Sequence, residues 1–563
     1  MNESAVGKET KPAKRSEALP SPQAVGLLLL VVAFAAGSAS LLSTPIDDAC
    51  ISFRYLDNWL RGEGLVFNPG ERVEGYSNLL WILLLAIPAL FGARPHLASL
   101  HIEWFLAPGC LLLLAFAATK VARRKNEPYL VAPLLLVFNS AFFFWIGKGM
   151  EVVLYTTLQL SLAVTILVSR GCETLRWRDG VLLGLIAAAA ALTRPEGVVA
   201  PAIVLVMLAV AERGRRKLYL LAFAILAVAV AGQFVFRLAY YGLLWPNTYY
   251  AKRLPTSLAL MGGLGYLRKF LVGASEGEAW FYISGWASHW PAWVVCAAAW
   301  AFAAKRWRRL WPAALQMASL VAVAIYVGGD WMPAFRFFVP AIPLGCLLVA
   351  AGLSEMAGDS AAHGQDTPAT SPQWRRTLAI GLLSILVIVE GIGLGNMVQS
   401  HEFTRWRHHI RNYGAMAAWL NKNARPNSLV ALSDIGIISY QNPRLRFMDV
   451  LGLTDPHIAS LPGIHYLKTD VEYVLRRQPD YVLVMLFEWP ELKQMMPKTP
   501  FDALFLEHIE EKKDFDMVAE VFGWKEGLSG ERHVWFQVYA RKADLGQSAD
   551  KTTSTTAAEI PNP

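Results

Sequence analysis

Long apolar segments alternate with short polar ones over roughly the first 400 residues of the chain. A helix needs about 20 mostly apolar residues to cross the ~30 Å hydrocarbon core of a membrane. We therefore expect an α-helical polytopic membrane protein with about 11 transmembrane helices. The candidate spans lie at 24–44, 101–121, 129–146, 152–169, 179–193, 197–212, 217–240, 288–304, 310–328, 335–353 and 376–396.

Basic residues indicate how these helices are oriented. Six basic clusters fall on one side of the membrane if every candidate span crosses it, and the positive-inside rule makes that side cytoplasmic. The N-terminal tail, 1–23, is then cytoplasmic, and the protein is a multi-pass protein of the cytoplasmic membrane. The same count requires the apolar stretch at 79–92 to be an interfacial or partly inserted helix on the outer side. The clusters are "KETKPAKR" before the first span, "ARRKNE" at 122–127, "RWRD" at 176–179, "ERGRRK" at 212–217, "KRWRR" at 305–309 and "WRR" at 374–376.

Composition supports a membrane protein and changes near residue 398. The chain is 55% hydrophobic and 17% charged, whereas a soluble domain carries about a quarter charged residues. The net charge of +8 belongs to the short loops between apolar segments, so nucleic acid is not an expected partner. Residues 399–545 return to a soluble composition, and 546–563 have the composition of a disordered tail. We expect a small α/β C-terminal domain on the extracytoplasmic side, with strands at 428–434, 444–450, 480–487 and 533–540 and helices at 403–421 and 471–477.

Two adjacent carboxylates, Asp47 and Asp48, follow the first candidate span. Neighbouring carboxylates at a membrane boundary are costly unless something uses them. They open the first outer loop, 45–100. Within this loop, Ile51, Tyr55 and Trp59 repeat every four residues while Arg54, Asp57 and Arg61 point elsewhere, as in a helix that lies in the membrane interface.

Five further polar groupings fall on the same outer face. Any one of them is typical of a helix end, or of a basic side chain that reaches the membrane surface. All six groupings on one side, the two aspartates included, indicate a site instead. The five are "EGYSN" (74–78), "GKGME" (147–151), "LTRPEG" (192–197), "YYGLLWPNTYYAK" (240–252) and "GGDWMPAFR" (328–336).

The residue types in these groupings fit one reaction. A carboxylate can accept a proton from a hydroxyl, and a second carboxylate nearby raises its pKa toward a useful value. Arginine and lysine bind phosphate oxygens and stabilise a phosphate leaving group, so Arg194, Lys252 and Arg336 are assigned to a phosphate. Asp47-Asp48-Ala49 is not a DxD metal motif, so no cofactor is assumed, although a divalent cation could bridge carboxylate and phosphate. The combination indicates transfer of a sugar from a lipid phosphate.

At these motifs the chain resembles the GT-C superfamily of integral-membrane glycosyltransferases, and most of all the group of the mycobacterial terminal β-(1→2)-arabinofuranosyltransferase. The resemblance covers about residues 24–353 and continues into the C-terminal domain with "LSDIGIISY" and "MDVLGLTDPHIA". It implies a GT-C transmembrane core at 24–398, a polyprenyl-phosphate sugar donor, and a cell-envelope glycan or glycoconjugate acceptor on the outer face of the membrane. It offers arabinofuranose as one candidate sugar.

The resemblance also assigns roles to residues. An aspartate just after the first span is the expected catalytic base, which maps onto Asp47 or Asp48 without deciding between them. The grouping "GKGME" departs from the expected "SGLE" at Lys148 and Met150. The residues that the resemblance implies for substrate binding are Arg54, Glu74, Tyr76, Asn78, Glu151, Arg194, Glu196, Asn247, Tyr250, Lys252, Asp330, Trp331 and Arg336.

Two other classes of function are compatible with the composition. A transporter or lipid flippase would also combine many helices with polar groups, but transporters show inverted repeats and broken midplane helices. This chain has no internal repeat, and its ionisable residues crowd one face. A sensor or scaffold would not need buried carboxylates beside cations. Residues 399–545 contain none of the six groupings, so we expect them to shape the acceptor entrance without a role in the chemical step.

Overall fold

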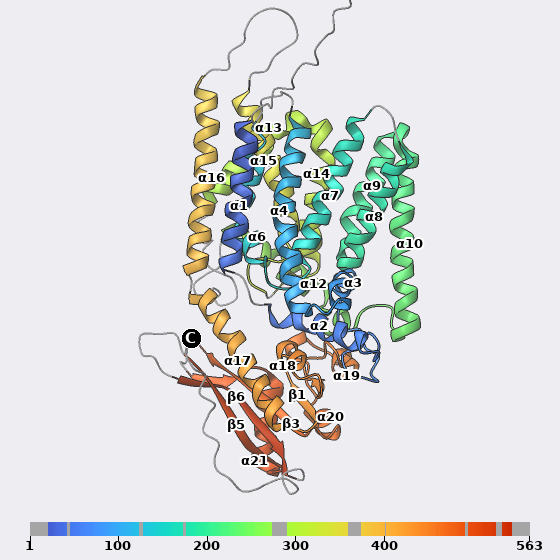
Figure 1. Ribbon diagram of the computed structural model, residues 1–563, viewed down its shortest axis with the longest axis vertical. Helices are drawn as coiled ribbons and strands as arrows, with labels where there is room; N and C mark the ends of the chain where they lie inside the picture. The colour runs from blue at the N-terminus through green and yellow to red at the C-terminus, as the bar shows by residue number, and fades with distance from the viewer. Residues whose placement is uncertain are drawn as a thin grey trace, which may run out of the picture.

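The computed structural model describes residues 21–41, 45–122, 128–172, 176–272, 290–330, 332–358, 373–399, 401–489, 494–524 and 532–542. These residues form a bundle of long helices with an α/β domain attached to one end (Figure 1). We call this end of the bundle the domain-side end and the opposite one the far end. The expected disordered tail at 546–563 and the predicted site residue Trp331 lie outside the described residues.

Helices occupy every segment in which the sequence predicts a transmembrane span. Six helices in the described part of the chain are long and apolar enough to cross a membrane. The full count of about 11 spans stays a prediction. The bundle contains α1 (Pro22–Leu41), α4 (Pro95–Val121), α5 (Val131–Phe138), α6 (Ser140–Phe144), α7 (Val152–Gly171), α8 (Trp177–Thr193), α9 (Val199–Ala211), α10 (Arg216–Tyr241), α13 (Trp290–Ala303), α14 (Trp307–Tyr326), α15 (Ile342–Ala357) and α16 (Gln373–Gln399).

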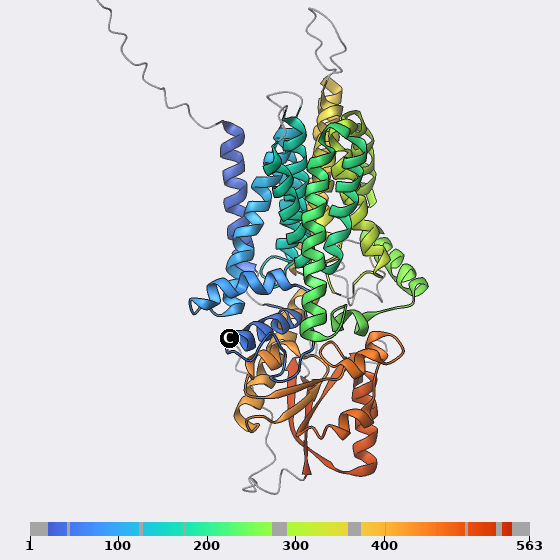
Figure 2. The ribbon, with the colours of Figure 1, turned by 90° about the vertical axis from the view of Figure 1, so that its right-hand side faces the viewer.

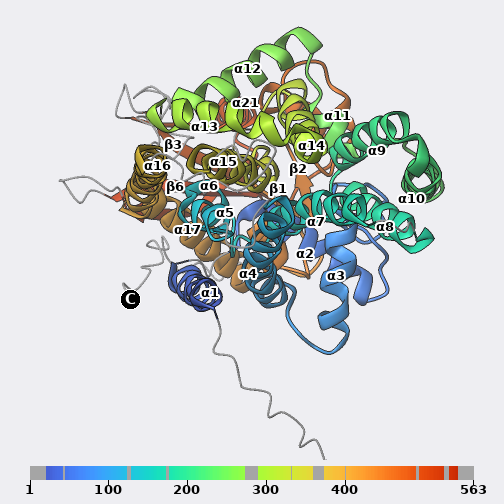
Figure 3. The same ribbon diagram turned by 90° about the horizontal axis from the view of Figure 1, so that it is seen from above.

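The helices differ in how much of their surface the bundle covers. The apolar windows of α7 and α15 are each 72% buried, whereas that of α16 is 17% buried and that of α10 is 28% buried. Figure 3 shows α7 and α15 surrounded by other helices, with α10 and α16 at the edge. Since α10 and α16 are as apolar as the central helices, their outer faces have the character of surfaces in contact with lipid.

The far end of the bundle gathers the basic clusters that the structure describes. Arg170 binds Glu212 at 2.5 Å and donates to the backbone carbonyls of Arg308 and Arg309 in the first turn of α14. Arg306 binds Glu355 at 2.5 Å, and Arg215 donates to the carbonyl at the end of α7. These loops therefore meet on one side of the bundle, as the count of spans requires.

Two helices at the domain-side end do not run along the bundle. They are α2 (Asp47–Leu60) and α3 (Leu79–Leu90), and Figure 2 shows both crossing below the long helices. For α3 this is the arrangement that the sequence predicts, because its 12 residues are too few to cross a ~30 Å hydrocarbon core.

The surroundings of α2 correct a prediction. Its apolar spacing was expected to face lipid, with Arg54 directed elsewhere. In the structure α2 lies between the bundle and the α/β domain, and Ile51, Arg54 and Tyr55 are all buried. Only the end of the helix is open, where Trp59 is 40% exposed and Leu60 is 39% exposed. The apolar stripe of α2 thus packs mainly on protein.

The C-terminal domain is built on a mixed sheet in the order β2-β1-β3-β6-β5, with β4 paired to β3. The pairs β1–β2 and β1–β3 are parallel, whereas β3–β6 and β5–β6 are antiparallel. The sequence predicts β1, β2, β3 and β6 but does not predict β4 or β5. The strands are β1 (Leu429–Leu432), β2 (Arg446–Asp449), β3 (Tyr481–Trp489), β4 (Gln494–Pro497), β5 (Phe515–Trp524) and β6 (Arg532–Arg541).

Alternate residues of β3 serve two different cores. Successive side chains of a strand point to opposite faces. Val482 and Val484 pack with α21 (Pro500–Lys512), while Leu483 and Met485 belong to the large core that continues into the bundle. The side of that core nearest the sheet is formed by α17 (His401–Asn423), α18 (Gly436–Gln441) and α2. The domain is therefore packed onto the bundle through a shared hydrophobic core.

A buried ion pair ties the first loop to the bundle. Arg237 Nε of α10 lies 2.8 and 3.0 Å from the two carboxylate oxygens of Glu74, and both side chains are almost fully buried. The backbone carbonyl of Glu74 also accepts a hydrogen bond from the N–H of Asn247. The carboxylate of Glu74 is therefore engaged in holding the loop, and its assignment to substrate binding stays a prediction.

Replacing Glu74 with Gln is expected to destabilise the protein by about 3–5 kcal/mol, because Arg237 would be left as an uncompensated buried charge. The measurement is the thermal unfolding of the detergent-solubilised protein. The double variant Glu74→Gln/Arg237→Gln should recover part of the loss, and Glu63→Gln, at an exposed position of the same loop, should change little. An unchanged melting temperature for Glu74→Gln would show that the pair does not hold the loop.

Candidate functional site

The two aspartates at the start of α2 have different surroundings. Both carboxylate oxygens of Asp47 accept hydrogen bonds from backbone N–H groups of the C-terminal domain, that of Gly436 at 3.0 Å and that of Ile437 at 2.6 Å. Asp48 is half-buried and, within the described part of the chain, makes no hydrogen bond through its side chain. Asp47 is thus occupied by a structural contact, and Asp48 is available for chemistry.

Charged groups from three parts of the chain lie close enough to Asp48 to affect its ionisation. Burial raises the pKa of Asp48, Lys252 and Arg336 lower it, and Asp330 and Asp434 raise it again, with a raised pKa as the net result. Lys252 ends α11 (Asn247–Lys252), a short helix at the domain-side end. The structure therefore brings Asp48 together with two of the three cations that the sequence assigns to a phosphate.

The C-terminal domain contributes to this cluster. Burial and the negative charges of Asp434 and Asp48 raise the pKa of Asp47 to about 7, against the opposing effect of the two backbone N–H groups. Asp434 itself binds Lys498 and accepts a hydrogen bond from the Tyr413 hydroxyl. Asp434 was not among the predicted site residues. The signal for it in the sequence is a carboxylate two residues after the strand "LVAL".

The segment between α14 and α15 is strained where it carries Asp330 and Arg336. Ala334 and Phe335 adopt the left-handed backbone conformation, with φ of 54° and 49°, which costs free energy in residues other than glycine. Arg336 Nε lies 2.6 Å from Asp330 Oδ2 in an ion pair without the alignment of a hydrogen bond. Strain of this kind gathers at functional sites.

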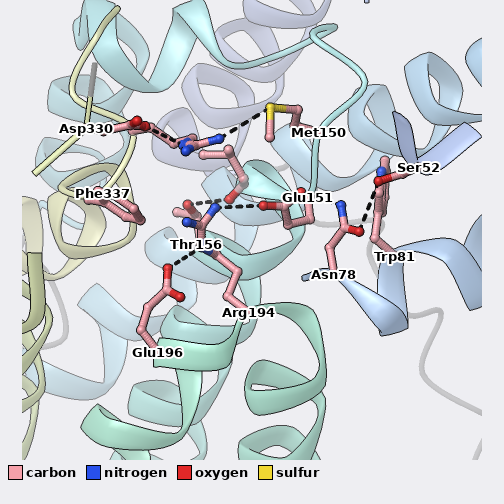
Figure 4. Close-up of polar contacts among 12 residues, drawn as sticks. Ser52, Asn78, Trp81, Met150, Glu151, Thr156, Arg194, Glu196, Asp330 and Phe337 are labelled. Carbon is pink, nitrogen blue, oxygen red and sulfur yellow. Dashed lines mark hydrogen bonds and ion pairs between the residues drawn. The ribbon is translucent and has the colours of Figure 1, made fainter. Parts of the chain in front are cut away.

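A chain of buried polar contacts links α2 to the other predicted residues (Figure 4). The Ser52 hydroxyl donates to Asn78 at 3.0 Å, and the Asn78 amide donates to Glu151 at 2.8 Å. Arg194 then binds Glu151 at 2.7 Å and also binds Glu196. Because Arg194 is shared by two carboxylates, this part of the cluster carries no surplus positive charge.

An aromatic ring lies close to both arginines of the cluster. The guanidinium carbon of Arg194 lies 4.8 Å from the centre of the Phe337 ring, and that of Arg336 lies 5.3 Å from it. A small hollow lies here, lined by Arg194, Glu196, Arg336 and Phe337 among others. It has room for about one water molecule.

The backbone of the "GKGME" loop is held by contacts with two other parts of the chain. Gly147 and Gly149 both have φ of 77°, a conformation that favours glycine. The buried carboxylate of Glu103 accepts hydrogen bonds from the N–H groups of Gly147 and Lys148, at 2.5 and 3.0 Å. The carbonyl of Lys148 accepts from the N–H of Ile46, directly before the two aspartates. Glu103, which was not among the predicted site residues, therefore helps to hold the loop that supports α2.

Four residues predicted to bind substrate make contacts within the protein, three of them across the seam between bundle and domain. Arg54 donates to the carbonyls of Phe67, Ser439 and Leu445, at 2.8, 2.5 and 2.8 Å. The Asn247 amide donates to two carbonyls of the domain, at 2.8 and 3.1 Å. The hydroxyl of Tyr76 is 3.2 Å from that of Tyr241, and the carbonyl of Tyr250 accepts from Lys468. The contacts of Arg54, Asn247 and Tyr76 are structural, and the assignment of these residues to substrate binding stays a prediction, as does that of Tyr250.

No three His, Cys, Asp or Glu side chains of the described residues are grouped so that they could hold a metal ion.

Comparisons with known proteins connect both parts of the chain to other sequences and structures. A family model described as "Domain of unknown function (DUF8728)" matches residues 400–539, which form the α/β domain. The terminal β-(1→2)-arabinofuranosyltransferase of Mycobacterium tuberculosis (strain ATCC 25618 / H37Rv) is 30% identical over 221 residues. That match covers 37% of this chain and 34% of the relative, so it spans about a third of the relative's length.

Solved structures match over most of the chain. ArnT from Cupriavidus metallidurans in the apo state has a TM-score of 0.58 and 15% identity, covering 93% of this chain and 99% of that one. The archaeal oligosaccharyltransferase AglB from Archaeoglobus fulgidus, in complex with an inhibitory peptide and a dolichol-phosphate, has a TM-score of 0.55 and 13% identity. It covers 88% of this chain and 80% of that one. These likenesses are at the level of the fold: the chain shares the fold of ArnT and AglB, and part of it is similar in sequence to a mycobacterial arabinofuranosyltransferase.

Proposed function

We propose that the protein transfers a sugar from a polyprenyl-phosphate donor to a cell-envelope glycan or glycoconjugate, with Asp48 as the general base. The observation that carries this proposal is the position of Asp48, a half-buried carboxylate close to the cations Lys252 and Arg336 at one end of a membrane bundle. The similarity to an arabinofuranosyltransferase over part of the chain supports glycosyl transfer and makes arabinofuranose the first sugar to test.

Lipid phosphates bound to proteins of the same fold support the donor class. ArnT has also been solved with undecaprenyl phosphate, at a TM-score of 0.55 and 12% identity, and AglB was solved with a dolichol-phosphate. In this chain we assign the phosphate to Lys252 and Arg336, because both act on Asp48 and neither is shared by two carboxylates in the way that Arg194 is. Cationic donors of this kind stabilise the charge that develops on a leaving phosphate.

The proposed step uses these three side chains. The acceptor hydroxyl gives its proton to the Asp48 carboxylate while its oxygen forms a bond to the anomeric carbon of the sugar. The bond from that carbon to the phosphate oxygen breaks, and the electron pair leaves with the polyprenyl phosphate. Lys252 and Arg336 stabilise the negative charge that this phosphate gains. A raised pKa makes Asp48 a better proton acceptor, provided that the two cations keep it ionised at neutral pH.

The proposed orientation follows from the two ends of the bundle. The described basic loops meet at the far end, and the positive-inside rule favours a cytoplasmic position for such loops. The site and the α/β domain would then face the extracytoplasmic side, where a lipid-linked sugar and a cell-envelope acceptor can meet.

Asp48→Asn should lower the rate of transfer by about 10²–10⁴-fold, the usual effect of removing a general base. The assay incubates purified protein with a panel of polyprenyl-phosphate sugars and an acceptor. Asp47→Asn keeps one acceptor for the two N–H groups of the domain and should stay at least tenfold more active than Asp48→Asn. If Asp47→Asn is the more damaging change, then Asp47 is the base. If the wild type uses no donor of the panel, the proposed reaction fails.

Lys252→Gln and Arg336→Gln should each weaken the use of donor by about 1.5–3 kcal/mol, the range for a hydrogen bond to a charged group. The measurement is kcat/KM for the donor at saturating acceptor. Arg253→Gln is the matched control, because Arg253 follows Lys252 in the sequence but is exposed to solvent. An unchanged donor dependence, with a defect only in acceptor saturation, would contradict the phosphate assignment of the residue concerned.

Asp434→Asn should move the acid limb of kcat/KM to lower pH. The base must be ionised, so activity falls as the pH drops through the raised pKa of Asp48. The groups around Asp48 are the cations Lys252 and Arg336 and the anions Asp330 and Asp434, and removing one anion lowers the pKa of Asp48.

The measurement is the pH profile of kcat/KM, with Asp514→Asn as the control. Asp514 is a partly exposed carboxylate of the same domain, paired with His508, and its removal should leave the limb in place. An acid limb that stays fixed or moves to higher pH in Asp434→Asn would show that Asp434 does not act on the base.

A further inference from the structure

Two charged side chains of α2 bind the same short helix of the C-terminal domain. Asp47 accepts the N–H groups of Gly436 and Ile437 at the beginning of α18. Arg54 donates to the carbonyls of Ser439 and Leu445, in and just beyond the last turn of α18. Asp47 and Arg54 are seven residues apart in α2, about two helical turns, so their side chains leave the same face of the helix. We call this pair of contacts the α2–α18 clamp.

The charges of the clamp match the ends of the helix that they bind. The free N–H groups at the start of a helix carry a partial positive charge, and the free carbonyls at its end carry a partial negative charge. Asp47 accepts from two N–H groups at the beginning of α18. Arg54 donates to the Ser439 carbonyl in its last turn, which also accepts from the N–H of Asn442.

The beginning of α18 lies unusually close to α2. A Cβ atom added at Gly436 would be 1.9 Å from the backbone carbonyl oxygen of Asp47 and 2.7 Å from its carboxylate carbon. Both distances are shorter than any real contact of a Cβ atom. The backbones can approach this closely only because residue 436 has no side chain.

We propose that α18 positions the general base, so that the C-terminal domain is part of the catalytic machinery for every acceptor. This inference rests on the proposed function. Asp48 follows Asp47 directly, so the clamp fixes the backbone that carries it from the domain side. On the other side, the N–H of Ile46 donates to the carbonyl of Lys148 at 3.0 Å and fixes the same backbone to the bundle. Asp48 is therefore held between one contact from each part of the molecule.

This inference differs from what the sequence predicts for the domain. If the domain only shaped the acceptor entrance, loosening it would impair a long polymeric acceptor more than a short synthetic one. If α18 positions Asp48, loosening it lowers kcat for both acceptors alike, and the KM for the donor changes little because Lys252 and Arg336 lie outside the clamp. The test must therefore separate kcat from KM and use both acceptors.

The experiment compares Gly436→Ala with Gly414→Ala in the full-length, membrane-inserted protein. Gly414 lies in α17 of the same domain, and a Cβ atom added there meets no other atom within 4 Å. We expect Gly436→Ala to lower kcat by about 10²-fold with both acceptors, as a displacement of about 1 Å at a reacting group can do. Gly414→Ala should behave as the wild type. Hydrogen–deuterium exchange should show faster exchange across α2 in Gly436→Ala alone.

A second variant covers the case in which Gly436→Ala fails to fold. Arg54→Lys keeps the charge but loses the planar fork that reaches several carbonyls, so it should show the same loss of kcat in milder form. Wild-type kcat and exchange in these variants, or a loss confined to the polymeric acceptor, would overturn the positioning role. A wild type inactive with every donor would instead refute the proposed function, and the exchange measurement would still decide whether α18 holds α2.

Discussion

The contact between α2 and α18 is the constraint on which the arrangement of the site depends. Asp47 and Arg54 bring a carboxylate and a guanidinium into a protein interior, where an unpaired charge is strongly unfavourable. Both are stabilised by backbone groups of a domain almost 400 residues further along the chain. The first loop itself supplies a further partner for Arg54, the carbonyl of Phe67, so α2 is held both by its own loop and by the C-terminal domain. We propose that this contact also positions Asp48, which α2 carries.

This constraint also explains why two adjacent aspartates stand at the end of the first span. Their like charges repel, and burial raises the pKa of both. The structure separates their roles: Asp47 is held by two N–H groups of the domain, and Asp48 lies near Lys252 and Arg336. One carboxylate thereby gains a structural contact, and the other gains cations that favour its ionised form. A single aspartate could not serve both purposes.

The sequence predicts the features that depend on local pattern. Helices lie at every expected apolar segment, α3 crosses the bundle without spanning it, and four of the strands occur where alternation indicates them. The sequence does not predict in the same way which surfaces α2 and the first loop contact. The spacing of α2 is the same whether its apolar stripe meets lipid or protein, so Arg54 was assigned to the substrate although it binds backbone carbonyls. Likewise, Glu74 is paired with Arg237, which is 163 residues away, and no local signal reveals such a partner.

The most direct measurement is a cryo-EM structure of the full-length protein with a non-hydrolysable polyprenyl-phosphate sugar bound. The phosphate should contact Lys252 and Arg336, and the anomeric carbon should lie on the side of Asp48 with room for an acceptor hydroxyl between them. The α2–α18 clamp should be intact in the same structure. A phosphate bound at the far end of the bundle, or an anomeric carbon that faces Asp47 with Asp48 turned away, would contradict the account.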